Sequence, residues 1–194
     1  MKVDDLLRDL ESFGIENDRT QTDRSKRMLN ITRDTGEMLA VLIKATGSRR
    51  ILEIGTSNGY STLWLAEAAQ SIGGSVTTIE RSEFKIALAK TNFERSGLNH
   101  VIHQIHDEAG SVLPGLPDSQ TDLIFLDSYR TDYPAWWPHI RRALRPGGLL
   151  VVDNALTHRE DLHPFVHLVE GDAEFSSCLV PIGHGEFLAV KNRD

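Results

Sequence analysis

The chain alternates between short apolar runs and longer segments in which apolar residues recur at helical spacing. The short runs are rich in branched residues and bounded by turn residues, which is typical of buried strands; they are Arg50–Ile54, Ser75–Glu80, His100–Ile105, Asp122–Asp127 and Gly148–Asp153. The helical segments that follow them are Ser61–Ala69, Ser82–Ser96, Ala109–Leu113 and Asp132–Leu144. Strands that alternate with helices predict an α/β fold, with a mostly parallel sheet covered by helices on both faces.

Further elements are predicted at both ends of the chain. Near the N-terminus, a helical stripe over Val3–Phe13 is expected to end at about Gly14, and the polar run Glu16–Arg27 is expected to be a mobile connector. The remaining predictions are a helix over Asp34–Thr46 that stops at Gly47, a sharp stop at Arg145–Gly148, a helix over Arg159–Val169, and a hairpin of Glu174–Pro181 and Glu186–Lys191 joined by Ile182–Gly185.

A glycine-bracketed turn joins the first of these strands to its helix. A dinucleotide fingerprint requires Gly-x-Gly-x-x-Gly, but this turn reads Glu53-x-Gly55-x-x-x-Gly59. A carboxylate at Glu53 would repel a pyrophosphate and would accept hydrogen bonds from an ammonium group. The helix start near Ser61 offers free N–H groups to a carboxylate. S-adenosylmethionine carries both groups, although an ordinary strand–turn–helix without a ligand remains an alternative for this motif taken alone.

Acidic residues close four of the predicted strands, at Glu53, Glu80, Asp127 and Asp153. Ligands of parallel sheets bind beyond the carboxyl ends of the strands, so these side chains are expected at one edge. Glu80 can accept hydrogen bonds from ribose hydroxyls, which NAD and S-adenosylmethionine both possess. The alternative for Glu80 is a cap on the helix that begins at Ser82.

Asp127, Asp153 and Asn154 form a second group of polar strand ends. Two carboxylates and an amide supply hard oxygen ligands, which suit Mg²⁺, Mn²⁺ or Ca²⁺ rather than zinc. Adjacent strand ends lie roughly 5 Å apart, so the three side chains can converge. Ordinary capping and turn chemistry is the alternative for these residues.

Composition further limits the possible domain organisation, partners and compartment of the protein. With 194 residues, 40% of them hydrophobic, the chain is expected to form one globular domain, and no apolar run approaches the roughly 20 residues that span a bilayer. The net charge of −7 argues against nucleic acid or an anionic membrane as the main partner. The charged N-terminus does not read as a secretory signal. The single cysteine, Cys178, fits a reducing cytoplasm and is expected to be buried because its neighbours are apolar.

Several motifs together resemble the cation-dependent O-methyltransferases of the catechol and caffeoyl-CoA type, which use S-adenosylmethionine. The likeness spans about Met28 to the C-terminus. It rests on Ile51–Thr56 with Gly59–Thr62, Thr78–Glu80, Ala109 with Leu113–Pro114, Phe125–Asp127, Tyr133–Pro134, Leu144–Gly148 and Asp153–Leu156. The resemblance implies a class I methyltransferase (Rossmann-like) fold with seven strands in the order 3-2-1-4-5-7-6. It implies a single methyltransferase domain over 1–194, with an N-terminal helix and connector in 1–33 and the cofactor-binding core in 34–194, and commonly a homodimer.

The resemblance also implies a role for each site residue. Glu53, Gly55 and Ser61 would hold the methionine end of the cofactor, and Glu80 would hold its ribose. The adenine would be bordered by Arg81, Ala109 and Tyr129, and the cofactor would be covered by Ile31. Asp127, Asp153 and Asn154 would bind Mg²⁺ or a similar ion, and Asp127 would also serve the cofactor site.

One residue departs from the family pattern. The resemblance places a lysine general base three residues after the first metal aspartate, where this chain has Arg130. Arginine keeps its proton at neutral pH, so it cannot act as a base, although it could orient an anionic substrate. A cation could instead activate a coordinated hydroxyl. His184 and Glu186, in the hairpin, are candidate bases, and the alternative for His184 is a plain turn residue.

Together these features indicate a cytoplasmic methyltransferase that acts on a hydroxyl of a small, catechol-like molecule with a divalent cation. The alternatives are a metal-independent methyltransferase, a non-catalytic cofactor-binding homologue and a nicotinamide dehydrogenase. The last is disfavoured by the missing middle glycine and by the lack of a Tyr-x-x-x-Lys pair. The loop after Thr157 is short, so the acceptor is poorly constrained. The aromatic residues Tyr133, Trp136 and Trp137 are expected to pack in the core rather than line the acceptor site.

Overall fold

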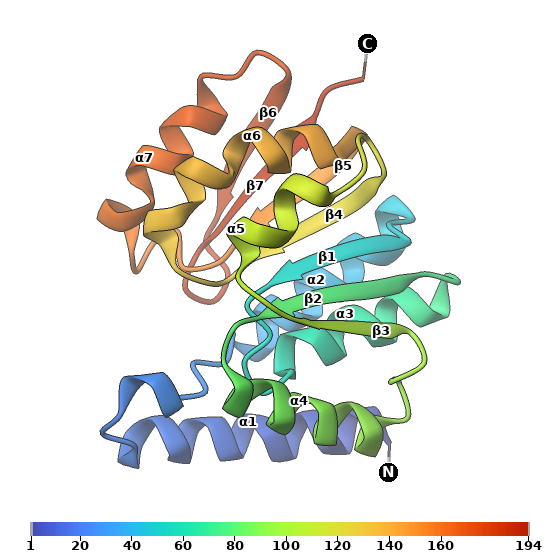
Figure 1. The fold of residues 1–194 in the computed structure, drawn as a ribbon, viewed down its shortest axis with the longest axis vertical. Helices are drawn as coiled ribbons and strands as arrows, with labels where there is room; N and C mark the ends of the chain where they lie inside the picture. Colours follow the sequence, from blue (N-terminus) through green and yellow to red (C-terminus); the bar gives the residue numbers. More distant parts are fainter. Residues whose placement is uncertain (1, 194) are drawn as a thin grey trace.

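The computed structural model describes residues 2–193 and contains one seven-stranded sheet in the order β3-β2-β1-β4-β5-β7-β6 (Figure 1). Neighbouring strands from β3 to β5 are parallel, and β7 runs antiparallel to both β5 and β6. This topology confirms the predicted α/β fold and strand order. The strands are β1 (Arg50–Ile54), β2 (Ser75–Glu80), β3 (Ile102–His106), β4 (Thr121–Leu126), β5 (Leu144–Val152), β6 (Phe175–Val180) and β7 (Glu186–Lys191).

Helices cover both faces of the sheet because the strands present apolar side chains to both sides. The central strand β4 is buried along its whole length, with Leu123 and Phe125 in the core on one face and Ile124 and Leu126 in the core on the other. The first face packs against α1 (Val3–Thr20), α2 (Arg33–Thr46), α3 (Tyr60–Ser71) and α4 (Glu83–Ser96). The second packs against α5 (Ala109–Val112), α6 (Tyr133–Ala143) and α7 (Arg159–Glu170). None of these helices is both long and apolar enough to cross a membrane.

The first helix is longer than the sequence predicts. The prediction of an end near Gly14 is wrong, because α1 continues to Thr20. Gly14 is buried, and a Cβ built on it would lie 2.4 Å from Nδ2 of Asn30, so this glycine permits a close approach rather than ending the helix. The prediction of a connector from Glu16 onward is therefore wrong for its first residues.

Two predictions about the C-terminal half are also wrong. Cys178 is exposed, because β6 is the last strand of the sheet and most of its side chains, including the apolar Leu179, face away from the core. The segment Arg145–Gly148 is not a stop before the strand, since β5 already begins at Leu144, with a register irregularity opposite Thr121 and Leu123. The predicted hairpin turn between β6 and β7 is present.

Candidate active site

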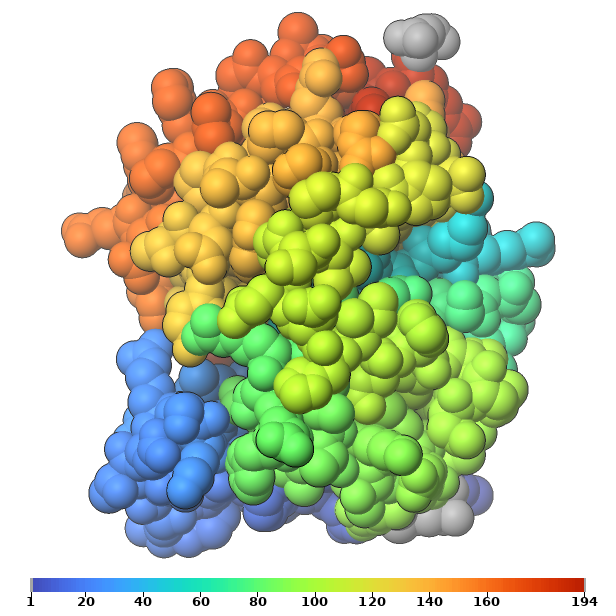
Figure 2. Space-filling view, viewed as in Figure 1, coloured from blue at the N-terminus to red at the C-terminus, as the bar shows by residue number. Residues whose placement is uncertain are grey.

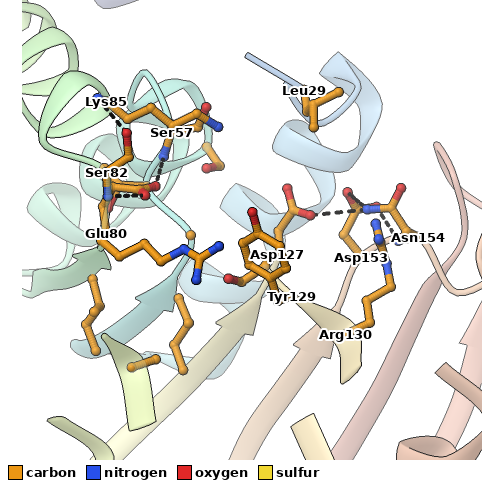
Figure 3. Close-up of a pocket in the computed structure, with 18 of the residues that line it drawn as sticks. Leu29, Ser57, Glu80, Ser82, Lys85, Asp127, Tyr129, Arg130, Asp153 and Asn154 are labelled. Carbon is orange, nitrogen blue, oxygen red and sulfur yellow. Dashed lines mark hydrogen bonds between the residues drawn. The ribbon is translucent and has the colours of Figure 1, made fainter. Parts of the chain in front are cut away.

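A cavity of about 860 Å³ opens where the parallel strands end (Figure 3). Its walls come from the β1–α3 turn, the residues after β2, β4 and β5, the β6–β7 turn and the segment between α1 and α2. In Figure 2 the surface is hollowed between the blue N-terminal segment and the yellow and orange segments. The predicted site residues that line this cavity are Ile31, Gly55, Ser61, Glu80, Arg81, Ala109, Asp127, Tyr129, Arg130, Asp153, Asn154 and His184.

Glu53 is one of two predicted site residues that do not line the cavity; the other is Glu186. Glu53 is fully buried, and its carboxylate accepts hydrogen bonds from Ser61 Oγ (2.6 Å), Thr78 Oγ1 (2.6 Å) and Thr62 Oγ1. Burial raises the pKa of Glu53 to about 7, while the three hydroxyl groups oppose that rise. Through these hydrogen bonds Glu53 links the start of α3 to β2 and stabilises the glycine turn.

At two positions of the glycine turn, only glycine can adopt the observed backbone conformation without a steric clash. Gly55 has a φ of 109°, and a Cβ there would lie 2.0 Å from the backbone oxygen of Asp127. Gly59 has a φ of 87°, and a Cβ there would lie 2.5 Å from the ring of Phe93. The turn thus packs against β4 and α4 and aims the N-terminus of α3, with Ser61 in its first turn, at the cavity.

Glu80 is fixed at the end of β2 by backbone donors. Its Oε2 accepts from the N–H of Ser57 at 3.0 Å, and its Oε1 accepts from the N–H of Ser82 at 2.9 Å (Figure 3). Helix α4 is capped by the hydroxyl of Ser82, which accepts from the N–H of Lys85 at 3.4 Å. Glu80 is therefore not the cap of α4, and its carboxylate is held at the cavity wall.

Arg81 and Tyr129 lie together on the wall beyond Glu80. The Arg81 guanidinium carbon is 3.9 Å from the centroid of the Tyr129 ring, a close cation–π contact. Arg81 also pairs with Glu108 at 3.4 Å, and Ala109 lines the same part of the cavity. The structure thus brings the three residues predicted to border an adenine to one place.

The three predicted cation ligands also come together. The Asn154 side-chain nitrogen donates to Asp127 Oδ1 at 3.2 Å and to Asp153 Oδ2 at 2.8 Å, and its backbone N–H donates to Asp153 Oδ1 at 2.6 Å (Figure 3). Asn154 adopts a left-handed backbone with a φ of 69°. Burial and the charge of Asp153 raise the pKa of Asp127 well above its usual value. Burial likewise raises the pKa of Asp153.

A third acid, Glu186, lies against this pair. It is fully buried and accepts a hydrogen bond from Thr35 Oγ1 at 2.9 Å, while its Oε2 has no partner within residues 2–193. Burial and the charge of Asp153 raise the pKa of Glu186 to about 10. The raised pKa favours the protonated form of Glu186 in the cation-free protein, and its role as a candidate base stays a prediction.

The donor set fits a hard divalent cation. No group of three or more His, Cys, Asp or Glu side chains arranged as metal ligands occurs within the described part of the chain. The predicted set has only two such residues, because its third member is the amide of Asn154. Two crowded carboxylates whose pKa values are raised by burial would be stabilised in their charged form by a cation, and the amide can turn its oxygen inward.

Arg130 and two histidines occupy the wall next to these acids. The Arg130 side chain points toward Asp153 and Asn154 (Figure 3), yet forms no ion pair within 4.0 Å among the described residues. His184 lines the cavity. His158 also lines the cavity but was not singled out from the sequence. Its position four residues after Asn154, at the sheet edge, was the available signal, and its backbone N–H donates to Asn154 at 2.9 Å.

The segment between α1 and α2 forms a wall that sequence reasoning missed. The Asp18 carboxylate accepts from the N–H groups of Met28 (2.7 Å) and Leu29 (2.9 Å), and Ser57 Oγ donates to the Met28 oxygen at 2.6 Å. These bonds hold Leu29 above Asp127 (Figure 3), with a φ of 52°. The buried Ile31, predicted to cover the cofactor, lines the cavity nearby.

The aromatic residues of α6 are core residues, as the sequence predicts. Tyr133, Trp136 and Trp137 are all buried and pack around Phe165 and Phe175. The Tyr133 hydroxyl accepts from the N–H of Ser128 at 2.6 Å, which fixes the segment after β4. Trp136 additionally reaches the cavity wall.

Comparison with known proteins agrees with this geometry. The O-methyltransferase family model matches residues 9–192. A putative O-methyltransferase of Mycobacterium avium is 32% identical over 175 residues, covering 84% of this chain and 78% of that protein. The catechol O-methyltransferase of Niastella koreensis is 30% identical over 156 residues, covering 78% and 70%.

A solved structure supports the fold independently. The O-methyltransferase of Bacillus cereus in complex with SAH superposes with a TM-score of 0.82 at 24% identity, covering 97% of this chain and 91% of that one. At this identity the likeness concerns the fold. Taken with the family match, it means that this chain belongs to the O-methyltransferase family of the catechol and caffeoyl-CoA type and is an S-adenosylmethionine-dependent O-methyltransferase.

Proposed function

We propose that this enzyme transfers the methyl group of S-adenosylmethionine to a hydroxyl of a catechol-like small molecule, assisted by a divalent cation. The observation that carries this proposal is the contact of Asp127, Asp153 and Asn154 in the same cavity as the glycine turn. The catechol O-methyltransferase among the relatives supports the choice of acceptor. A carboxylate pair beside the cofactor turn would let a cation and a methyl donor share one pocket.

The cofactor would be held by residues from three strand ends. The N-terminus of α3 at Ser61 would bind the cofactor carboxylate, close to Gly55, whose lack of a side chain lets the backbone approach. Glu80 would accept from the ribose hydroxyls. Arg81 and Tyr129 would border the adenine, with Ala109 beside them.

The cation would be held by the two aspartates and the amide, with the oxygen of Asn154 turned inward. When bound, it would lower the pKa of a coordinated hydroxyl and position the resulting oxygen. Arg130 cannot take up the proton, because guanidinium stays charged. His184 is the proposed proton acceptor, and His158 is a second candidate. Burial and the charges of Arg130 and Arg24 lower the pKa of His158, which favours its neutral, proton-accepting form.

Methyl transfer without a cation remains the competing function, because Arg130 stands where the resemblance places a lysine. In that case the raised pKa values of Asp127 and Asp153 would make one of them an acid–base group instead of a ligand. The resemblance also supports a homodimer, which light scattering coupled to size-exclusion chromatography would test.

The deciding experiment measures transfer to catechol with Mg²⁺, with EDTA, and after Asp153→Ala. We expect transfer that requires the cation and that falls by at least about 100-fold in the variant. Calorimetric titration with S-adenosylhomocysteine serves as the control, since Asp153→Ala should leave measurable binding of the cofactor product. Full activity in EDTA would select the metal-independent alternative, and absence of transfer despite tight product binding would favour a different acceptor.

A further inference from the structure

Two arginines line the cavity without an ion pair. Neither the Arg24 nor the Arg130 guanidinium makes a hydrogen bond or an ion pair within residues 2–193. Several other arginines of the chain are paired, such as Arg141 with Asp172 and Arg145 with Asp122. Arg130 is half-buried and Arg24 is exposed, and the N–H donors of both guanidinium groups have no protein acceptor among the described residues. A guanidinium in this situation is a ready binding group for an anion.

The two arginines line the same cavity as Asp153, Asn154 and His158. Arg24 is presented by a short 3-10 turn, whose N-cap is Asp23, and Arg130 by a second one between β4 and α6. Arg24 therefore reaches the cavity from the segment between α1 and α2, and Arg130 reaches it from the segment after β4, where it lies beside Asp153 and Asn154 (Figure 3).

Nearby carboxylates do not neutralise these guanidinium groups. Asp132 and Asp161 also line the cavity, but neither pairs with Arg24 or Arg130 within 4.0 Å. A divalent cation held by Asp127 and Asp153 would balance the charges of these two carboxylates. The positive charge of Arg130 would then have no counter-charge of its own in the acceptor part of the cavity.

We propose that the methyl acceptor carries an oxyanion, a carboxylate or a phosphate-type group, that Arg130 and Arg24 bind while its hydroxyl is turned toward Asp127 and Asp153. This inference rests on the proposed function and narrows its acceptor to hydroxylated anionic molecules. A guanidinium presents paired N–H groups whose spacing matches both oxyanions, which a lysine ammonium does not. The anion would also orient the acceptor, since Arg130 lies beside Asp153 and Asn154 (Figure 3).

The test uses the full chain with Mg²⁺ and S-adenosylhomocysteine, titrated calorimetrically with 3,4-dihydroxybenzoate, with its methyl ester and with 3,4-dihydroxyphenylphosphonate. The anions are expected to bind roughly 10- to 100-fold more tightly than the neutral ester, as charged hydrogen bonds do. Methyl transfer to the same compounds should show the same preference in kcat/KM. The preferred anion, benzoate or phosphonate, identifies which oxyanion the site takes.

Arg130→Met and the double variant with Arg24→Met should bring the anion-to-ester ratio close to one. Arg159→Met is the matched control, because Arg159 is an exposed arginine of α7 that lies outside the cavity, and this variant should keep the ratio. A thermal melt of each variant excludes unfolding.

The outcomes separate the two proposals. Equal binding of acid and ester by the unsubstituted protein, or an unchanged ratio in the double variant, overturns the inference and leaves the cation-assisted methyl transfer intact. Failure of all three compounds to be methylated counts against the proposed function. In that case the calorimetric ratio still decides the anion site, since binding does not require turnover.

Discussion

The carboxylates at the carboxyl edge of the sheet have two different kinds of surroundings. At the ends of β1 and β2, Glu53 and Glu80 have both oxygens occupied by hydroxyl or backbone donors of the protein itself. At the ends of β4, β5 and the start of β7, the acids Asp127, Asp153 and Glu186 lie against one another and share few donors. In the first pair, hydroxyl donors oppose the rise that burial causes in the pKa of Glu53, whereas in the second group the charge of Asp153 adds to the rise that burial causes in the pKa values of Asp127 and Glu186.

This contrast shows at which end of the cavity the carboxylates already have hydrogen-bond donors from the protein. A carboxylate that accepts hydrogen bonds from nearby protein donors is fixed in position at the ligand-binding surface. Its removal leaves those donors unpaired. A carboxylate crowded by other acids destabilises the fold in its charged form until a proton or a cation compensates it. Removing one acid should therefore have opposite effects on the stability of the two ends of the cavity.

The largest effect is expected from Asp153→Asn, which keeps the shape of the side chain and removes one charge. Cation-dependent transfer should fall by at least about 100-fold because a ligand is lost. The free protein should become more stable by roughly 1 kcal/mol at pH 8, because repulsion with Asp127 is relieved. Activity with added Mg²⁺ and denaturant unfolding of the same samples measure the two changes. A variant that is both active and less stable would contradict the contrast.

The next effect is expected from Glu80→Gln at the compensated end. Half of the amide cannot accept a hydrogen bond, so the N–H of Ser57 or Ser82 loses its partner. Binding of S-adenosylhomocysteine should weaken by about 10- to 100-fold, and stability should fall rather than rise. Glu83→Gln, an exposed acid of the same helix start, is the control and should change neither quantity. Unchanged product affinity in Glu80→Gln would remove the ribose role.

Much of this site follows from sequence because strand ends are easy to locate. The carboxyl ends of the apolar runs in β2, β4 and β5 are clear in the sequence. Such ends share one edge in a parallel sheet, so Glu80, Asp127 and Asp153 could be grouped without coordinates. The local pattern of β6 and β7 similarly predicts the hairpin that brings His184 to the same edge.

The remainder depends on contacts between distant segments, which no local pattern encodes. The sequence predicts a helix end at Gly14, but α1 continues past this glycine, which packs closely against Asn30. The same tertiary contacts place Arg24 and Leu29 over the cavity, although their segment reads only as polar chain. Glu53 reads as a ligand of the cofactor, yet hydroxyls that come together only in the folded state occupy its carboxylate.

A smaller effect is expected in the dependence of stability on pH. Glu53 has a folded-state pKa of about 7 against an ordinary value of 4.5, so the folded protein binds more protons than the unfolded chain between these values. Stability of the ligand-free protein should therefore fall as the pH rises from about 4.5 through 7, and Asp127, Asp153 and Glu186 should add to the same trend.

Glu53→Gln should remove about 2 kcal/mol of this fall, while Mg²⁺ should reduce only the part that comes from the crowded acids. Urea unfolding at pH 5 and pH 8, with and without Mg²⁺, separates the two contributions. If the stability of the ligand-free protein instead rose across this range, ionisation of the buried acids would not destabilise the fold. Their pKa values would then not be raised.

The smallest effect concerns Arg130, whose side chain lies beside Asp153 and Asn154 (Figure 3). Arg130→Lys retains the positive charge but loses the planar fork and gains a group that can release its proton. Transfer to neutral catechol should rise several-fold at pH 8 to 9, with a rate that increases with pH, because a lysine close to the cation can serve as a base.

Transfer to an anionic acceptor should fall in the same variant, since a single ammonium replaces paired N–H groups. The ratio of the two rates is therefore more informative than either rate, because a general disturbance of the site would move both in one direction. The matched comparison is Arg130→Met, which should lower the rate with the anion and give no new pH dependence with catechol. A pH profile that is identical in the parent enzyme and Arg130→Lys would mean that the proton leaves through His184 or His158, and that Arg130 contributes charge and orientation alone.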